Sequence, residues 1–175
     1  MLGPGRLEVA NGFPLKTELG GTSLLVSVEG KTVRPWLIYA QNMQVAALLP
    51  STTPTGVGSL TVSYGGKTSA PKPIRVVRSS FGIFTRNQAG TGPGILQNVN
   101  SEADRPVNGL HIAARANQAV ILWGTGLGPV AGAEEAQPLP GDLAVPLDVF
   151  VGVKPARVLY KGRSGCCAAI DQIVF

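Results

Sequence analysis

The sequence predicts an all-β fold, and both its composition and its apolar periodicity lead to that prediction. The chain has 175 residues, of which 23 are glycine and 14 are proline, so a helix-breaking residue occurs about every five positions. Hydrophobic residues make up 44% of the chain and charged residues only 14%, the reverse of the balance that keeps a chain disordered. The composition therefore excludes a mainly helical protein and a disordered chain, and it indicates a globular protein rich in turns and short strands.

The strands of the first half can be placed from apolar alternation. Residues 24–30 and 58–64 alternate apolar with small polar side chains, which indicates strands with one buried face. Residues 35–39 form an apolar strand that ends in tyrosine, and a Gly-Gly pair after residue 64 is typical of a hairpin turn. The side chains expected in one interior are Val26, Val28, Leu37, Tyr39 and Val45.

The same order of elements returns in the second half. Residues 148–152 repeat the alternating strand at 24–30, and residues 155–160 repeat the apolar strand that ends in tyrosine. Repeats of this length are duplicated domains rather than solenoid turns. We expect residues 1–78 to form a first β-sandwich and residues 79–175 a second. The second interior should hold Val149, Val151, Val158 and Tyr160.

The second β-sandwich is expected to be incomplete at its C-terminal end. No counterpart of residues 58–64 follows Phe175, so the last strand should form a bare edge that accepts added strands. The residues of this strand-addition edge are Gln172, Ile173, Val174 and Phe175. Completion should come from self-association, from the remainder of a larger parent chain or from a strand of another chain. The expected donor within the chain is residues 1–9, and head-to-tail donation of this kind would build filaments.

Three glycines, Gly124, Gly126 and Gly128, follow an apolar strand at residues 119–123. A dinucleotide-binding loop would need a helix directly after the glycines. Pro129 and Gly132 crowd the segment where that helix would begin. We therefore predict a structural turn that binds no nucleotide or other cofactor, and in which at least one of the glycines has a positive φ.

Residues that could bind a metal or catalyse a reaction are few. Cys166 and Cys167 are adjacent, and adjacent strand residues point to opposite faces, so a bond between them would be unusual and their pairing stays open. The chain has one histidine, His111, and no Cys-x-x-Cys motif, which excludes a zinc site of the usual kind. No Gly-x-Ser-x-Gly motif accompanies that histidine, so we predict no catalytic residue. Side-chain oxygens occur at alternate positions in one loop, which makes a calcium site there an alternative to the favoured interpretation, a solvated loop. The four residues are Asn98, Asn100, Glu102 and Asp104.

The charged and aromatic residues argue against two classes of partner. A basic run could attract nucleic acid, but no aromatic side chains interleave with it to stack on bases, so we favour a solvated strand face that protects an edge. The run consists of Lys67, Lys72, Arg75, Arg78 and Arg86. No apolar run approaches the roughly 18 residues of a membrane helix, so membrane insertion is not expected. Trp36 and Trp123 lie within apolar strands and should belong to the core.

One segment carries a family resemblance. Residues 120–130 read Val-Ile-Leu-Trp-Gly-Thr-Gly-Leu-Gly-Pro-Val, and with residues 81–85 and 165–173 they resemble the Solibacter-type uncharacterised C-terminal domain of large exported bacterial proteins. The resemblance implies two tandem immunoglobulin-like β-sandwich units, the second truncated here. It supplies no catalytic residue. Family members continue into further strands, and a cysteine found there implies a disulfide partner for Cys166 or Cys167.

These observations lead to one expected function and one alternative. We expect a non-catalytic β-sandwich module of a secreted or cell-surface bacterial protein that acts in structure, adhesion or assembly, with strand donation as a route. The alternative is a carbohydrate-binding module that holds a secreted enzyme to polysaccharide. A row of exposed aromatic side chains would favour the alternative.

Overall fold

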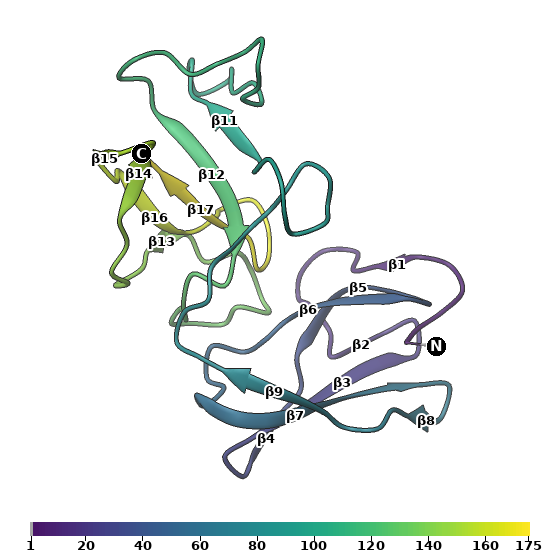
Figure 1. Ribbon diagram of the computed structural model, residues 1–175. Coiled ribbons are helices and arrows are strands. Elements are labelled where there is room, and N and C mark those ends of the chain that lie inside the picture. The colour runs from purple at the N-terminus through teal and green to yellow at the C-terminus, as the bar shows by residue number, and fades with distance from the viewer. Residues whose placement is uncertain (1) are drawn as a thin grey trace. The chain divides into compact units, whose positions relative to one another are not determined.

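The computed structural model describes residues 2–175 and is all-β, with 43% of residues in strands and 0% in helices (Figure 1). None of the described residues forms a helix long and apolar enough to span a membrane. The chain divides into two compact units. The first comprises the residues up to Arg78 together with Pro129–Leu139, and the second comprises Ser79–Gly128 together with Pro140–Phe175.

The first unit contains two antiparallel sheets. One sheet has the order β2-β3-β7-β8, with β4 beside β3 and β9 beside β7, and the other has the order β1-β5-β6. Their bounds are β1 Glu8–Val9, β2 Glu18–Leu19, β3 Thr22–Val28, β4 Lys31–Val33, β5 Trp36–Gln41, β6 Gln44–Leu48, β7 Gly56–Tyr64, β8 Lys67–Thr68 and β9 Lys72–Val76. Buried side chains come from both sheets, as expected for a sandwich.

The interior of the first unit follows the alternation in the sequence. Along β3, buried side chains alternate with half-buried ones, and Val26 and Val28 are buried with Leu37 of β5. Tyr39 and Val45, also expected in this interior, are half-buried. Burial of one face in this way fixes the register of the strand, because a slip of one residue would expose every apolar side chain.

The second unit is built on one larger sheet with the order β10-β12-β17-β16-β13, and β11 lies beside β12. A separate two-stranded hairpin joins β14 to β15. Their bounds are β10 Gly82–Ile83, β11 Leu96–Asn98, β12 Val120–Thr125, β13 Gly141–Asp142, β14 Val149–Val151, β15 Lys154–Ala156, β16 Tyr160–Arg163 and β17 Asp171–Val174. Leu127, Val145 and Ile173 form the buried cluster of this unit, and Val149 and Val158 pack against it.

The predicted edge at residues 172–175 is wrong. Strand β17 lies between β12 and β16, and Ile173 stands opposite Leu122 on one side and Lys161 on the other. Phe175 continues this pairing, since its backbone exchanges hydrogen bonds with Val120. Ile173 is only 1% exposed. The alternating pattern identified the strand correctly, but it carries no information on which strands lie beside it.

The predicted donor at residues 1–9 is also not free. Glu8 and Val9 of β1 pair with Ala40 and Tyr39 of β5, so the last two residues of this segment form a strand of the first unit. Met1 lies outside the described residues. Val151 was also expected in a second interior but is 60% exposed, and β14 has no strand on its outer side among the described residues.

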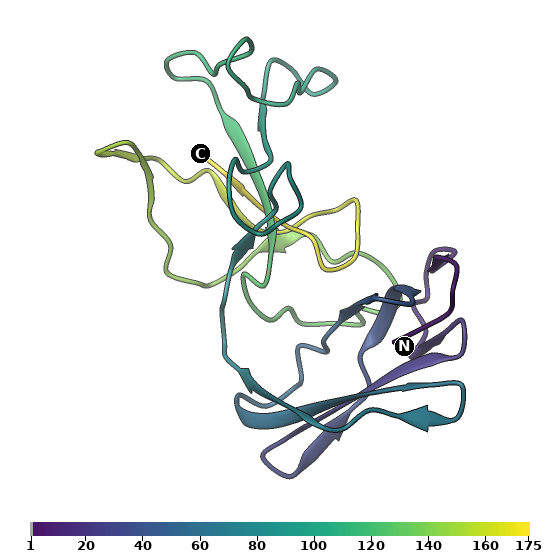
Figure 2. The same ribbon diagram turned by 45° about the vertical axis from the view of Figure 1, so that its right-hand side comes forward.

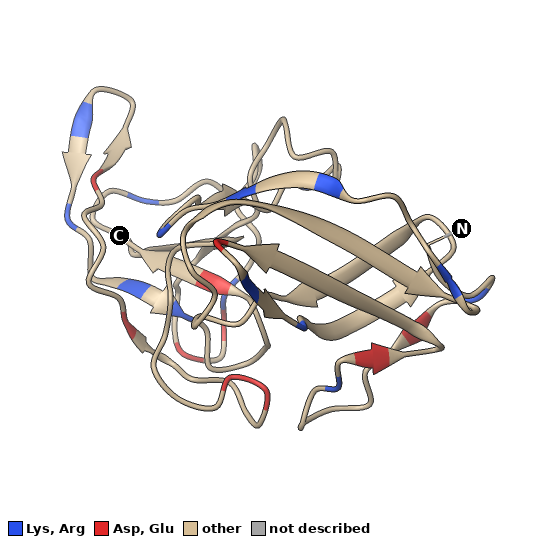
Figure 3. Cartoon of the chain, turned by 90° about the horizontal axis from the view of Figure 1, so that it is seen from below, with Lys and Arg blue, Asp and Glu red and all other residues tan. Residues whose placement is uncertain are grey.

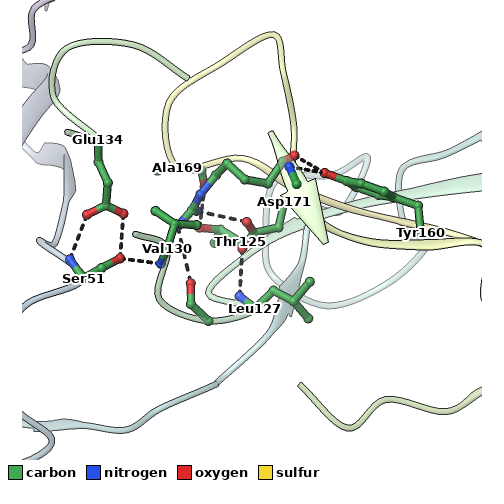
Figure 4. Close-up of polar contacts among 11 residues, drawn as sticks. Ser51, Thr125, Leu127, Val130, Glu134, Tyr160, Ala169 and Asp171 are labelled. Atoms are coloured by element: carbon green, nitrogen blue, oxygen red, sulfur yellow. Dashed lines mark hydrogen bonds and ion pairs between the residues drawn. The ribbon is translucent and has the colours of Figure 1, made fainter. Parts of the chain in front are cut away.

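The segment Pro129–Leu139 packs with the first unit although it follows β12 of the second. Glu134 is buried, and its carboxylate accepts hydrogen bonds from the backbone N–H of Ser51 at 2.8 Å and from its hydroxyl at 2.6 Å (Figure 4). The Ser51 hydroxyl oxygen accepts a bond from the N–H of Val130 at 2.9 Å. Sequence patterns did not predict this excursion of the chain.

Candidate functional site

The two units contain hairpins of matching register. In the first, Val26, Ser27 and Val28 of β3 stand opposite residues of β4. In the second, Val149, Phe150 and Val151 of β14 stand opposite residues of β15. The pairs are Val26–Val33, Ser27–Thr32 and Val28–Lys31 in the first, and Val149–Ala156, Phe150–Pro155 and Val151–Lys154 in the second. Every residue number in the second set is 123 above its counterpart, so the two hairpins occupy equivalent positions in the repeat.

The hairpins differ in what lies on their outer side. Strand β3 pairs with β7 along its whole length, and Val28 stands opposite Gly58 there. Strand β14 pairs only with β15 among the described residues, and the hairpin extends away from the sheet of its own unit (Figure 2). Two residues connect Val151 to Lys154, so these two residues form a hydrogen-bonded pair of the hairpin. In an antiparallel pair, hydrogen-bonded and non-hydrogen-bonded residue pairs alternate. The N–H and C=O of the next residue, Phe150, therefore point to the open side of β14.

Only one edge of the second hairpin carries residues that prevent strand addition. Lysine and proline blunt exposed edges, and β15 presents both in Lys154 and Pro155. Strand β9 of the first unit is protected in the same way by Lys72 and Pro73, which accounts for part of the basic run (Figure 3). The strand β14 has neither, and Phe150 is 62% exposed.

A groove lies between this hairpin and the sheet of the second unit. Its volume is about 1010 Å³. Apolar side chains from the sheet and the hairpin line it, among them Leu96, Val120, Val151, Leu159 and Phe175. Three cations also line it, namely Arg115, Lys154 and Arg157, and no carboxylate does.

The glycine segment forms a tight structural turn. Gly126 has a φ of +82°, the positive value expected for at least one of the glycines, and a Cβ there would lie 2.6 Å from the carbonyl oxygen of Ser80. A Cβ at Gly124 would lie 2.4 Å from the carbonyl oxygen of Gly82. The carbonyl oxygen of Gly128 accepts a bond from the side chain of Arg163 at 3.4 Å. Close backbone approach therefore accounts for the first two glycines without a ligand.

A buried ion pair holds this turn in place. The carboxylate of Asp171 accepts a hydrogen bond from the N–H of Leu127 at 2.7 Å and lies 3.0 Å from the guanidinium of Arg163 (Figure 4). Asp171 and Arg163 stand opposite each other on β17 and β16. Sequence reasoning missed this pair. Its signal was two opposite charges placed symmetrically at the ends of the turn at residues 164–170.

Cys166 and Cys167 form a disulfide with each other. Such a bond would be unusual if both residues lay on a strand. They lie instead in the turn between β16 and β17, where side chains do not alternate between faces. The N–H of Cys166 donates to the hydroxyl of Ser164, which supports the turn.

The candidate metal ligands and the one histidine do not form a common site among the described residues. Asn98 is buried, and its side chain donates to the carbonyl of Ile112 and accepts from Asn108, while Asn100 donates to Asp104. The described residues contain no cluster of three or more His, Cys, Asp or Glu side chains that could hold a metal ion. His111 is exposed in a loop.

The aromatic side chains do not form a row on the described surface. Trp36 and Trp123 are half-buried, and the indole N–H of Trp123 donates to Gln97 at 2.8 Å. The exposed aromatic side chains are Phe13 and Phe150, which belong to different units. No specific observation therefore favours carbohydrate binding.

Comparison with known proteins identifies no relative. No protein-family model matches the chain, and no curated protein or solved structure is significantly similar to it. The fold and the hairpin are thus the basis on which a function can be argued.

Proposed function

We propose that this chain is a non-catalytic β-sandwich module of an exported bacterial protein, and that it acts in assembly by accepting an extended strand of another polypeptide at β14. The observation that carries this proposal is the open outer side of β14, set against the equivalent strand β3, which has β7 on that side. The pairing of β3 with β7 thus serves as the template for the pairing of β14 with an added strand.

Unpaired backbone groups and exposed apolar surface favour the addition of a strand at β14. An open strand edge presents N–H and C=O groups that pair with an added strand. The hairpin also exposes Val151 and Val153 at its tip, and an added strand would remove part of that surface from water. The resemblance of residues 120–130 to domains of exported bacterial proteins supports a location at the cell surface or outside the cell.

The proposal can be tested with a labelled peptide that has the nine-residue sequence of β7. Fluorescence anisotropy of this peptide should show saturable binding to the chain. Phe150→Pro removes the N–H on the open side and leaves the pairing of Val149 and Val151 with β15 in place. It should weaken binding about tenfold, which corresponds to one lost hydrogen bond.

Phe150→Ala is the matched control, because it removes the same ring but keeps the N–H. It should bind the peptide far better than Phe150→Pro. Circular dichroism would establish that both variants are folded. Absence of peptide binding to the unmodified chain, or equal affinity for the two variants, would contradict strand acceptance at β14.

A further inference from the structure

From the groove beside β14 we infer the chemistry of its partner, and this inference rests on the proposed function. The partner is an extended segment of a different polypeptide, with apolar residues in its middle and carboxylates at its ends. The apolar residues fill the groove, and the carboxylates pair with Arg115, Lys154 and Arg157.

The cations come from two separate segments of the chain. Lys154 and Arg157 belong to β15 and the residue after it, whereas Arg115 belongs to the loop that leads into β12. All three side chains are exposed, and none of them makes an ion pair within the described part of the chain. Three unpaired positive charges around one apolar groove favour an occupant with negative charges on either side of an apolar centre.

The apolar surface of the groove fits the inner face of a strand. Val120 and Phe175 are neighbours in the sheet, because their backbones exchange hydrogen bonds, and they line the groove together with Leu96. Val151 of the hairpin lines the same groove. In the first unit, β7 alternates apolar with small polar residues beside the equivalent strand. A strand added to β14 would direct every second side chain into the groove.

A second copy of this chain is a poor occupant. The chain carries a net charge of +5, so two copies repel each other, and the groove itself is positive. The one segment proposed from the sequence as a donor is already paired as β1. A different polypeptide with acidic ends avoids both difficulties.

The test uses three peptides that share the β7 sequence and differ only in two residues added at each end. One peptide carries glutamates, one glutamines and one lysines. At low salt the glutamate peptide should bind the full chain about tenfold more tightly than the glutamine peptide, and the lysine peptide most weakly. The advantage of the glutamate peptide should shrink at high salt, because exposed charges are screened.

Variants of the chain locate the effect. Arg115→Gln, Lys154→Gln and Arg157→Gln should each reduce the preference for glutamate over glutamine, and the triple variant should abolish it. Arg105→Gln is the matched control, because Arg105 is exposed in the same unit but does not line the groove. It should leave the preference unchanged.

The outcomes separate this inference from the proposed function. If all three peptides bind equally and Phe150→Pro still weakens binding, strand acceptance stands and the acidic partner is overturned. If the glutamate peptide binds more tightly at low salt than at high salt but Phe150→Pro does not weaken its binding, the groove is an anion site without strand addition, and the inference fails. If the chain alone self-associates in sedimentation velocity and Phe150→Pro prevents it, the occupant is a second copy, which also overturns the inference.

Discussion

Val28 and Val151 occupy the same position in two hairpins of one register, yet Val28 is 1% exposed and Val151 is 60% exposed. One difference between their surroundings is a third strand. Val28 lies opposite Gly58 of β7, whereas the described chain places no strand on the outer side of Val151. The two hairpins share one register, and only the first has a further strand on this side among the described residues.

This pair gives a direct prediction about stability. Val28→Thr should destabilise the first unit by about 1–3 kcal/mol, because it buries a hydroxyl group in a position formerly occupied by a methyl group, without a hydrogen-bond partner. Val151→Thr should change stability by less than about 0.5 kcal/mol, as surface substitutions usually do. Urea unfolding of both variants measures this. Equal effects at the two positions would mean that the environments of the two hairpins are alike.

The buried ion pair of the second unit should be essential to its stability. Asp171→Ala leaves Arg163 without its carboxylate and the N–H of Leu127 without its acceptor. Removal of one member of a buried pair costs about 3–5 kcal/mol. A double-mutant cycle with Arg163→Met should give a coupling energy well above zero, measured by denaturant unfolding. If the two single effects simply add, the pair does not act as a unit.

The turn at Gly126 should not tolerate a side chain. Gly126→Ala places a residue with a Cβ at a positive φ and against the backbone of Ser80. The expected cost is about 1–3 kcal/mol, the usual range for such strain. Gly82→Ala is the control, because nothing lies within 4 Å of its Cβ position and its φ is ordinary. Thermal unfolding should separate the two variants, and a similar melting temperature for both would argue against a structural role for Gly126.

The segment Pro129–Leu139 should depend on Glu134. Glu134→Ala removes the acceptor for two bonds from Ser51, and a buried donor left unsatisfied costs about 1–3 kcal/mol. Amide hydrogen exchange in this segment should therefore become faster. Glu135→Ala is the control, since Glu135 contributes its backbone carbonyl to Leu15 and keeps it after substitution. Unchanged exchange in Glu134→Ala would show that other contacts hold the segment.

Local features of the sequence predicted the strands well. Alternation located β3 and β7 and the buried side chains Val26, Val28 and Leu37, because burial of one face imposes a period of two residues. The same alternation could not tell an edge strand from a central one. Strand β17 was predicted at an edge because no counterpart of residues 58–64 follows Phe175, although β12, which lies about 50 residues earlier in the chain, pairs with it.

Long-range polar contacts were outside the reach of sequence patterns. Ser51 and Glu134 are separated by 83 residues, and neither lies in a motif that predicts a partner. The groove has the same character, because Arg115 and Lys154 come from distant segments that the fold brings to one place. The repeat itself was visible in the sequence, and it is what makes the open hairpin interpretable.

Amide exchange at Phe150 is the decisive measurement for strand addition at β14. The N–H of this residue is expected to point to the open side of β14, so it should exchange rapidly in the chain alone. With a saturating concentration of the β7 peptide its exchange should slow by about tenfold or more, because the N–H then bonds to the added strand. The N–H groups of Val149 and Val151, which face β15, should change little. An exchange rate at Phe150 that the bound peptide leaves unchanged would contradict strand addition at this edge.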